Sequence, residues 1–197
     1  MTLMHTSLPD IILPQKIREF IECVPQTFIS TEERMRFTIE LARLNTIGKT
    51  GGPFGAAVFE SHSGKLVAAG VNVVVKNSCS HAHAEMVALF LAQQKLSTYD
   101  LGGSALPCHE LVSSCEPCAM CFGALIWSGV KKLVFGASGK TAEAAGFDEG
   151  PKPHLWIRAL EQRGIEVTGN VCSKEADAVL DNYVASGGLI YNAGKRA

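Results

Sequence analysis

Two cysteines, one histidine and one glutamate have the types and spacing of a metal site. Cys118 and Cys121 stand three residues apart in SCEPCAMC, and HAHAE contains His83 and Glu85. Side chains three residues apart share one face of a helix, and a helix N-terminus helps to keep thiols ionised. Zinc takes such N and S ligands, with three protein ligands and one open position where it is catalytic. We therefore expect His83, Cys118 and Cys121 to bind zinc.

Glu85 is the chemically informative member of this group, because a closed structural zinc site has no use for an acid beside an open coordination position. His-x-Glu followed by Pro-Cys-x-x-Cys is the motif pair of zinc-dependent nucleobase deaminases. Cys115 is the rival ligand, and with it the site would hold four protein ligands in a zinc-stabilised binding protein without turnover. Because Cys115 precedes Pro117, we expect it outside the helix, as a packed thiol.

Composition restricts the class of protein. The 197 residues are 47% hydrophobic, and Lys plus Arg number 18 against 19 Asp plus Glu, so one domain with an extension is expected and nothing favours a nucleic-acid partner. No run of about 18 apolar residues indicates a membrane span. The odd number of cysteines, 7, favours a reducing compartment over a disulfide framework. We expect a soluble, cytoplasmic protein.

Hydrophobic periodicity and turn residues place these motifs on alternating helices and strands. Residues 1–29 are expected to be an N-terminal extension packed on the domain, with a short helix near 15–23. Ser30 and Glu33 have the spacing of a capping box, which opens a helix that ends at Gly48.

The elements expected after that helix share clear boundaries in the sequence. They are a hairpin over 54–75, a helix over AHAEMVALFLAQQ, a strand over HELVSS, a helix over PCAMCFGALIWSG with proline in its first turn, a strand over VKKLVFGAS, a helix over 155–162, a strand over 165–171 and a helix over 174–183. This alternation predicts a mostly parallel sheet with helices on both faces. The domain is expected to span 30–185, followed by a C-terminal tail over 186–197.

Over roughly residues 53–149 the chain resembles the cytidine deaminase superfamily, and most closely the bacterial guanine deaminases. The resemblance rests on GGPFGAAV, AAGVNVVV, HAHAE, SSCEPCAMCFGALIWSGV, LVFGAS and AEAAGFDE. The first four are shared in looser form by adenosine and cytosine deaminases, whereas EAAGFDE favours guanine. The resemblance implies a three-layer α/β fold with a mixed central sheet of about five strands. It also implies one zinc ion per subunit with a bound water or hydroxide, and Glu85 as the catalytic residue that carries the proton of this water to the base and then to ammonia.

The same resemblance assigns substrate-binding roles by position. Asn72 should bind the edge of the base, Phe54 and Trp127 should line the pocket, and backbone N–H groups near Ala84 and Cys118 should hold the purine oxygen or the oxyanion. A place in the core is the alternative for Trp127, because aromatic residues at helical spacing are usually core.

Glu149 should accept hydrogen bonds from the substrate. Guanine presents a ring N–H and an exocyclic amine side by side, and a carboxylate accepts from both, whereas adenine has no such ring donor. Asp148 could exchange roles with Glu149, Glu143 is a third candidate, and a solvated acidic turn is the alternative for this segment.

The resemblance further implies a homodimer in which the C-terminal tail crosses to the partner subunit and caps its site. Tyr191 is the candidate capping residue. The chain departs from the family pattern in its N-terminal extension, in a longer interval between His83 and Cys118, and in the residues that follow Tyr191.

The expected function is hydrolytic deamination of guanine to xanthine and ammonia in purine catabolism, with a side activity on the triazine ammeline. The alternatives are a tRNA adenosine deaminase, which would need a basic face around the site, and a cytosine, cytidine or deoxycytidylate deaminase. The zinc-stabilised binding protein is the alternative from another class.

Overall fold

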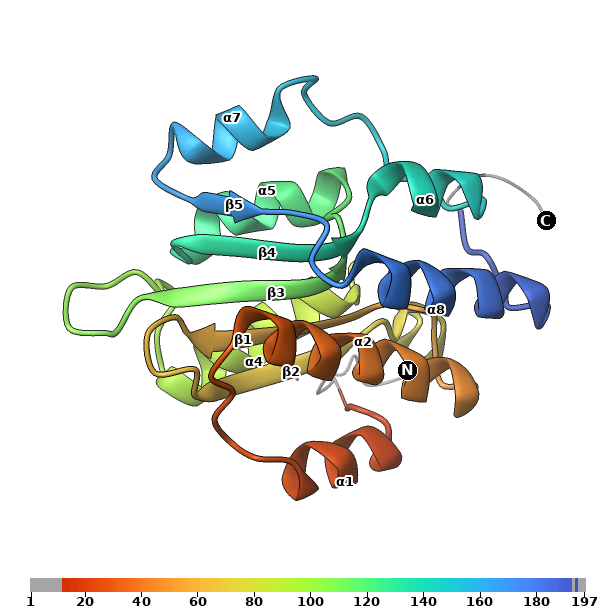
Figure 1. Ribbon diagram of the computed structural model, residues 1–197, viewed down its shortest axis with the longest axis horizontal. Coiled ribbons are helices and arrows are strands. Elements are labelled where there is room, and N and C mark those ends of the chain that lie inside the picture. Colours follow the sequence, from red (N-terminus) through yellow and green to blue (C-terminus); the bar gives the residue numbers. More distant parts are fainter. Residues whose placement is uncertain (1–11, 193, 195–197) are drawn as a thin grey trace, which may run out of the picture.

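A five-stranded mixed sheet forms the centre of the molecule (Figure 1), which the computed structural model describes over residues 12–192 and at residue 194. The strands are β1 (Gly55–Glu60), β2 (Leu66–Val71), β3 (His109–Cys115), β4 (Lys132–Ala137) and β5 (Glu166–Thr168), in the order β2-β1-β3-β4-β5. β1 is antiparallel to β2 and β3, while β3, β4 and β5 are parallel. The expected mixed α/β fold is confirmed, although the sheet is less parallel than the alternation of elements suggested, because β1 is antiparallel to both of its neighbours, β2 and β3.

Eight helices surround this sheet in the part of the chain that the structure describes. They are α1 (Gln15–Cys23), α2 (Thr31–Ile47), α3 (Val74–Asn77), α4 (Ala84–Leu96), α5 (Ala119–Ser128), α6 (Gly139–Ala144), α7 (Trp156–Glu161) and α8 (Ser173–Ala185).

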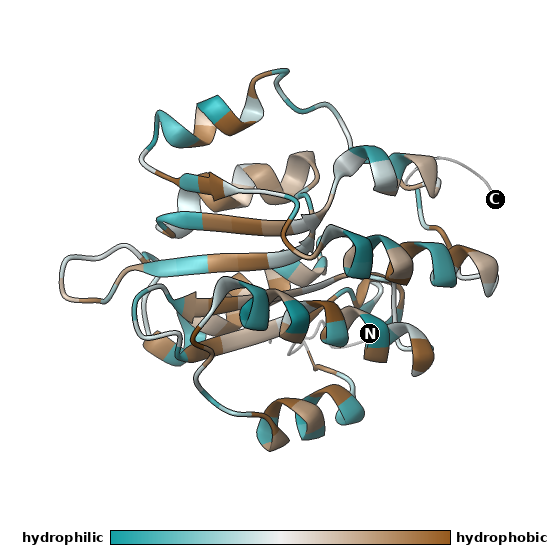
Figure 2. Cartoon of the chain, viewed as in Figure 1, coloured by the Kyte–Doolittle hydropathy of each residue, from teal (hydrophilic) through white to brown (hydrophobic). Residues whose placement is uncertain are grey.

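The sheet packs on both faces, so the molecule has three layers. Successive strand residues point to opposite faces. In β1, Ala57 and Phe59 join a cluster that also contains buried residues of α1, α2 and α8, whereas Ala56 and Val58 join a cluster with residues of α4, α5 and α7. Figure 2 shows hydrophobic residues along the central strands and hydrophilic residues on the outer faces of the helices.

Most expected elements are present, and the differences have local causes. Ser30 and Glu33 form the capping box, in which the Ser30 hydroxyl accepts from the Glu33 N–H at 3.1 Å, and α2 ends before Gly48. Residues 74–77 form helix α3 and do not extend the hairpin, because β1 begins opposite Val71 and the Asn72 side chain accepts from the Val74 N–H. α6 was not predicted. The chain boundaries proposed for the extension and the tail stay predictions.

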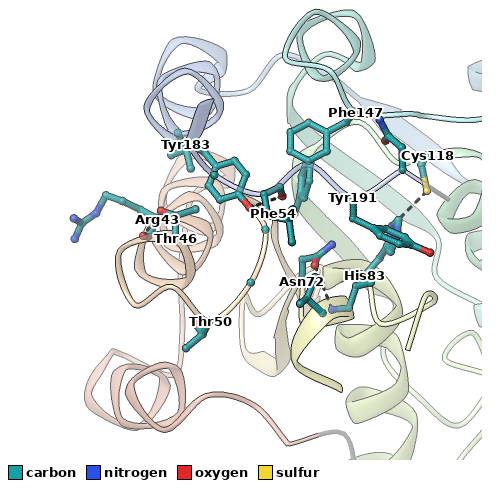
Figure 3. Close-up of a pocket in the computed structure, with 18 of the residues that line it drawn as sticks. Arg43, Thr46, Thr50, Phe54, Asn72, His83, Cys118, Phe147, Tyr183 and Tyr191 are labelled. Atoms are coloured by element: carbon teal, nitrogen blue, oxygen red, sulfur yellow. Dashed lines mark hydrogen bonds between the residues drawn. The ribbon is translucent and has the colours of Figure 1, made fainter. Parts of the chain in front are cut away.

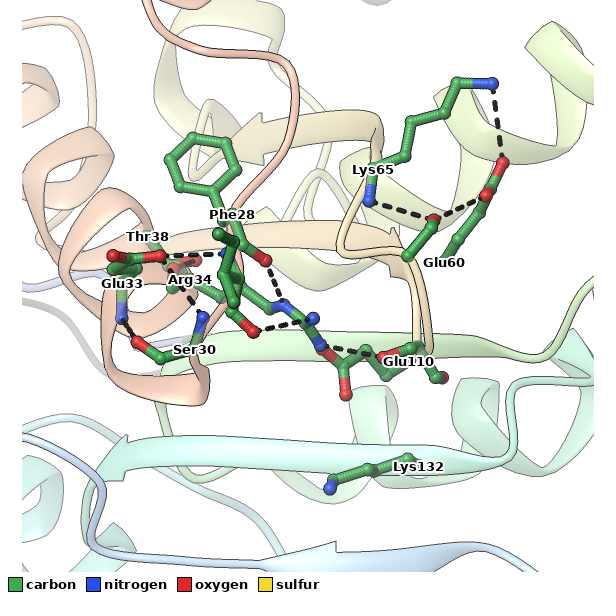
Figure 4. A network of polar contacts seen from close by, with 12 residues as sticks. Phe28, Ser30, Glu33, Arg34, Thr38, Glu60, Lys65, Glu110 and Lys132 are labelled. Carbon is green, nitrogen blue, oxygen red and sulfur yellow. Dashed lines mark hydrogen bonds and ion pairs between the residues drawn. The ribbon is translucent and has the colours of Figure 1, made fainter.

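A buried ion pair joins α2 to the sheet (Figure 4). Arg34 Nη1 lies 2.6 Å from Glu110 Oε1, and the two side chains are 6% and 1% exposed. Arg34 also donates to the carbonyl oxygens of Phe28, at 3.0 Å, and Ser61, at 3.1 Å. A single side chain thus fastens the segment before α2, the β1–β2 turn and β3 together.

Among the described residues, none of the helices is both long and apolar enough to cross a membrane.

Candidate active site

The expected metal ligands lie at the N-termini of two helices. His83 is the N-cap residue of α4 and Cys118 is the N-cap residue of α5, each with extended backbone angles. Cys121 is the third residue of α5. Pro117 therefore precedes the helix and does not lie in its first turn, as the sequence had suggested. Because the positive ends of two helix dipoles meet here, the site favours anionic ligands such as thiolates.

The spacing of these ligand atoms fits zinc. His83 Nδ1 lies 3.6 Å from Cys118 Sγ and 3.8 Å from Cys121 Sγ, and all three atoms lie within 4.8 Å of one another. Zn–S bonds of about 2.3 Å and Zn–N bonds of about 2.0–2.1 Å at tetrahedral angles place N and S roughly 3.6 Å apart. The residues present would thus hold zinc with three ligands and leave one position for another molecule.

Cys115 does not join this group. It is buried at the end of β3, where its Sγ lies 3.9 Å from the Ser138 carbonyl oxygen. Among the described residues the ligand cluster comprises His83, Cys118 and Cys121 alone. The arrangement is therefore that of an open site and not that of a four-ligand structural site.

The surroundings of Cys118 and Glu85 shift their pKa values in opposite directions. The hydrogen bond from the Cys121 thiol, assisted by His83, lowers the pKa of Cys118 to about 4. Burial, and next the charge of Cys118, raise the pKa of Glu85, which is only 6% exposed in the first turn of α4. A buried carboxyl whose pKa is raised toward neutrality is suited to accept and then release a proton.

A cavity of about 1510 Å³ opens in front of these residues. It extends from the metal ligands toward the C-terminal ends of α2 and α8, as Figure 3 shows. Glu85, His83 and Cys118 line its inner end. The acid and the open side of the ligand cluster therefore face the same space.

Asn72 and Phe54 form part of the cavity wall. The Asn72 backbone is fixed on both sides, since its N–H donates to the Phe54 carbonyl at 3.1 Å and its carbonyl accepts from Asn45 Nδ2 at 2.9 Å. Its side-chain Nδ2 donates to no residue in the described part of the chain. The Phe54 ring meets the Phe147 ring edge to face at 4.9 Å. These contacts leave the Asn72 amide available to a ligand beside an aromatic wall.

The three candidate acids differ clearly in their surroundings. Glu149 lines the cavity, is 7% exposed, and has an Oε2 atom without a hydrogen-bond partner among the described residues. Burial, followed by the charges of Cys118 and Glu85, raises its pKa to about 8. Asp148 also borders the cavity but is exposed, and its Oδ1 accepts from the Gly150 N–H. Glu143 is exposed on α6 and does not line the cavity.

Trp127 does not lie where the resemblance implied. Its side chain is 83% exposed at the end of α5, and it does not line the cavity of this chain. At 100° per residue, a position nine residues after Cys118 points to the opposite side of the helix from Cys118. The alternative of a core residue is equally wrong.

Ala84 is buried as the first residue of α4, where its N–H lacks an acceptor within the helix.

Residues 186–189, 191 and 192 of the tail line the cavity of their own chain. Tyr191 is 46% exposed and lines the cavity near His83 and Cys118 (Figure 3). Asn192 anchors this segment, since its Oδ1 accepts from the Asp148 N–H and its Nδ2 donates to the Gly146 carbonyl, both at 2.9 Å. An exchange of tails between subunits stays a prediction.

Several residues of the site were missed from the sequence. Phe147 and Tyr183 extend the aromatic wall, with ring centroids 6.3 Å apart, and the Tyr183 hydroxyl donates to the Leu189 carbonyl at 2.7 Å. Glu116 lines the cavity and pairs with Lys152. Phe147 precedes the acidic pair in the motif EAAGFDE, which was a usable signal, whereas nothing local in the sequence connects Lys152 with Glu116.

Comparisons with known proteins agree with this geometry. Residues 29–137 match the model of the cytidine and deoxycytidylate deaminase zinc-binding region. A solved guanine deaminase from Nitrosomonas europaea is 49% identical, with a TM-score of 0.87 over 92% of this chain and 98% of that one. A guanine deaminase from Bacillus subtilis is 38% identical over 50% of this chain, and the match spans 59% of that protein. A tRNA-specific adenosine deaminase from Haemophilus influenzae is 31% identical over 77% of this chain and 82% of that protein. The chain belongs to the family of the cytidine and deoxycytidylate deaminase zinc-binding region.

Proposed function

We propose that the protein is a zinc-dependent aminohydrolase that converts guanine and water to xanthine and ammonia. One observation carries the choice of guanine within the family: the buried Glu149 carboxylate, which faces the cavity with an oxygen that no described residue satisfies. Buried polar atoms are normally hydrogen-bonded, so such an oxygen calls for a donor from a ligand. The similarity to the guanine deaminase of Nitrosomonas europaea over nearly the whole chain supports the same choice.

The catalytic chemistry requires a nucleophile and a route for its proton. Zinc held by the two thiolates and His83 would lower the pKa of a bound water and so supply the nucleophile near neutral pH. Glu85 lies two residues from His83, buried and facing the same cavity. It can accept the first proton of the water and pass it to the ring nitrogen beside the amino-bearing carbon. It can then move the remaining proton of the added hydroxyl to the amino group, which leaves as ammonia while the C=O bond forms.

Recognition of the base is the second task of the cavity. In the ligand-free chain burial favours protonated Glu149, and the two adjacent donors of guanine would shift it to the ionised form. The carboxylate would then accept from the ring N–H and the exocyclic amine, which lie side by side. Asn72 would bind another polar edge of the purine, and Phe54 would pack against its ring. Tyr191 would cover the bound base from the side of the tail. Backbone N–H groups at Ala84 and Cys118 would hold the purine oxygen or the oxyanion.

A tRNA adenosine deaminase is the main rival, since a relative with that function matches 82% of its own length. Adenine offers no ring N–H next to an amine, so the buried Glu149 carboxylate would not receive the pair of hydrogen bonds that guanine provides. Cytosine, cytidine and deoxycytidylate carry their amine beside a ring nitrogen without hydrogen, so they also lack the adjacent pair of donors. Guanine fits the acid better than either.

The wider setting follows as part of the proposal. We infer one zinc ion per subunit, a homodimer, a cytoplasmic role in the breakdown of purines, and a side activity on ammeline, whose ring carries a similar edge of donors. The identity of a capping residue on a partner subunit belongs to the same set, with Tyr191 as the candidate.

Ammonia release from the purified zinc-loaded protein tests the proposal across guanine, adenine, guanosine, cytosine, cytidine, deoxycytidylate, ammeline and an adenosine-containing tRNA. Guanine should give the highest kcat/KM, with xanthine as the product. Preferred turnover of the tRNA, or of a pyrimidine, would overturn the assignment. Retention of zinc with silence across the whole panel would favour the binding-protein alternative.

A further inference from the structure

We propose that Lys152 is a positioning residue that fixes the base-reading carboxylate of Glu149 relative to the metal ligands; this inference rests on the proposed function. Among the described residues, Lys152 belongs neither to the ligand cluster nor to the lining of the cavity. It acts through the two segments that carry the acid and the ligand, and no motif in the sequence distinguishes it.

Lys152 is held by three partners at once. Its Nζ pairs with the Glu116 carboxylate and donates to the Pro117 carbonyl oxygen at 2.8 Å. The same atom lies 5.1 Å from the centroid of the Trp156 ring, a distance at which a cation is attracted to the ring face. The Lys152 and Glu116 side chains are only 11% and 16% exposed. A long, flexible side chain has thus been given a single place.

These contacts connect the acid to the metal ligands. Glu116 and Pro117 directly precede Cys118, and Lys152 follows Glu149 by three residues. A second tie joins the same two segments, since the Glu149 carbonyl accepts from the Ala119 N–H at 2.8 Å. The loop that carries the acid is therefore fastened on both sides of the ligand.

The loop needs such ties because it has no regular structure of its own. Residues 145–155 run between α6 and α7 without a helix or strand. Glu116 is a firm anchor, because its Oε2 also accepts from the Gly139 N–H at 3.1 Å. A misplacement of about 1 Å at a reacting centre can cost roughly 100-fold in rate. A mostly buried ion pair contributes little net stability after desolvation, which agrees with a role in geometry.

The test compares two variants with a matched control. Lys152→Met removes the tie but leaves Glu116 without its cation, so it is also expected to lower Tm. The double variant Glu116→Gln with Lys152→Met removes both charges, so no unpaired charge is left buried to destabilise the fold. Lys132→Met is the control, because it also removes a lysine that pairs with a glutamate, Glu166. Lys132 lies at the start of β4, at the opposite end of the strand from Ala137, whose carbonyl accepts from the Glu116 N–H.

We expect both Lys152 variants to retain zinc and to lose at least about tenfold in kcat/KM for guanine. The double variant should recover the Tm of the parent without recovering kcat/KM, while Lys132→Met should change kcat/KM by less than about twofold. A zinc-loaded double variant with the parental kcat/KM would overturn the positioning role alone. A parent protein that does not deaminate guanine would instead refute the proposed function, and this inference with it.

Discussion

Replacement of Glu149 by glutamine tests the recognition of guanine with the smallest change of shape. The carboxylate is 7% exposed and one of its oxygens has no protein partner in the described chain. Hydrogen bonds to a charged group contribute about 1.5–3 kcal/mol each. Glutamine keeps one acceptor but turns an N–H₂ group toward the second donor of guanine, so one bond is lost and two donors face each other.

The expected loss is about 3–4 kcal/mol in the transition state, which corresponds to a fall of roughly 10²–10³-fold in kcat/KM. Zinc content should be unchanged, because Glu149 is not in the ligand cluster. The assay is xanthine formation from guanine at low substrate concentration, with zinc measured on the same samples. A variant that retains zinc and the parental kcat/KM would refute the role of this acid.

The same variant should change the dependence of stability on pH. Burial raises the pKa of Glu149 from 4.5 to about 8, so folding favours its protonated form. The resulting contribution to the free energy of unfolding is present below pH ~4.5 and is lost as pH rises through ~8, with an upper limit of about 5 kcal/mol. Without substrate, Glu149→Gln should therefore gain Tm relative to the parent as pH rises across this range. A difference in Tm that shrinks with pH would contradict the buried environment.

Three further outcomes are expected. Cys118→Ser should lose both zinc and guanine turnover, and a chelator should have the same effect on the parent protein. Added zinc should restore turnover in the chelated parent but not in the variant, which metal analysis and kinetics on the same samples would check. Arg34→Met should lower the free energy of unfolding by about 3–5 kcal/mol, because it leaves Glu110 buried and unpaired. In denaturant titrations the double variant Arg34→Met with Glu110→Met should lose clearly less free energy of unfolding, and equal losses would show that the pair is not the cause. Trp127→Ala should leave KM for guanine within about twofold, since the side chain is exposed and lies outside the cavity; a large rise in KM would return Trp127 to the site.

Local sequence was sufficient where one short motif fixes both the residue and its position. His83 and Cys118 are the N-cap residues of two helices, so predicting where each helix begins also predicts where its ligand lies. Ser30 and Glu33 likewise encode the capping box within four residues. The alternation of elements was enough to predict layers of helices on both faces, whereas the mixed sheet was implied by the family resemblance.

Local sequence was insufficient where a position depends on the phase of a helix or on residues far apart in the chain. Trp127 was assigned by resemblance, but its direction depends on where α5 begins, and that start lies after Pro117. The pairing of Lys152 with Glu116 spans 36 residues and two loops, so no local pattern indicates it. The tail could be matched to a capping role, but its course over its own chain depends on the contacts of Asn192.

The most direct test of the central claim is xanthine formation from guanine by the zinc-loaded protein, measured beside Glu85→Gln at equal zinc content. We predict xanthine and ammonia in equal amounts from the parent, and a loss of at least about 10³-fold in kcat from the variant, because the proton of the water would have no carrier. No xanthine from the zinc-loaded parent would contradict the assignment of guanine. Undiminished turnover by Glu85→Gln would contradict the assigned chemistry.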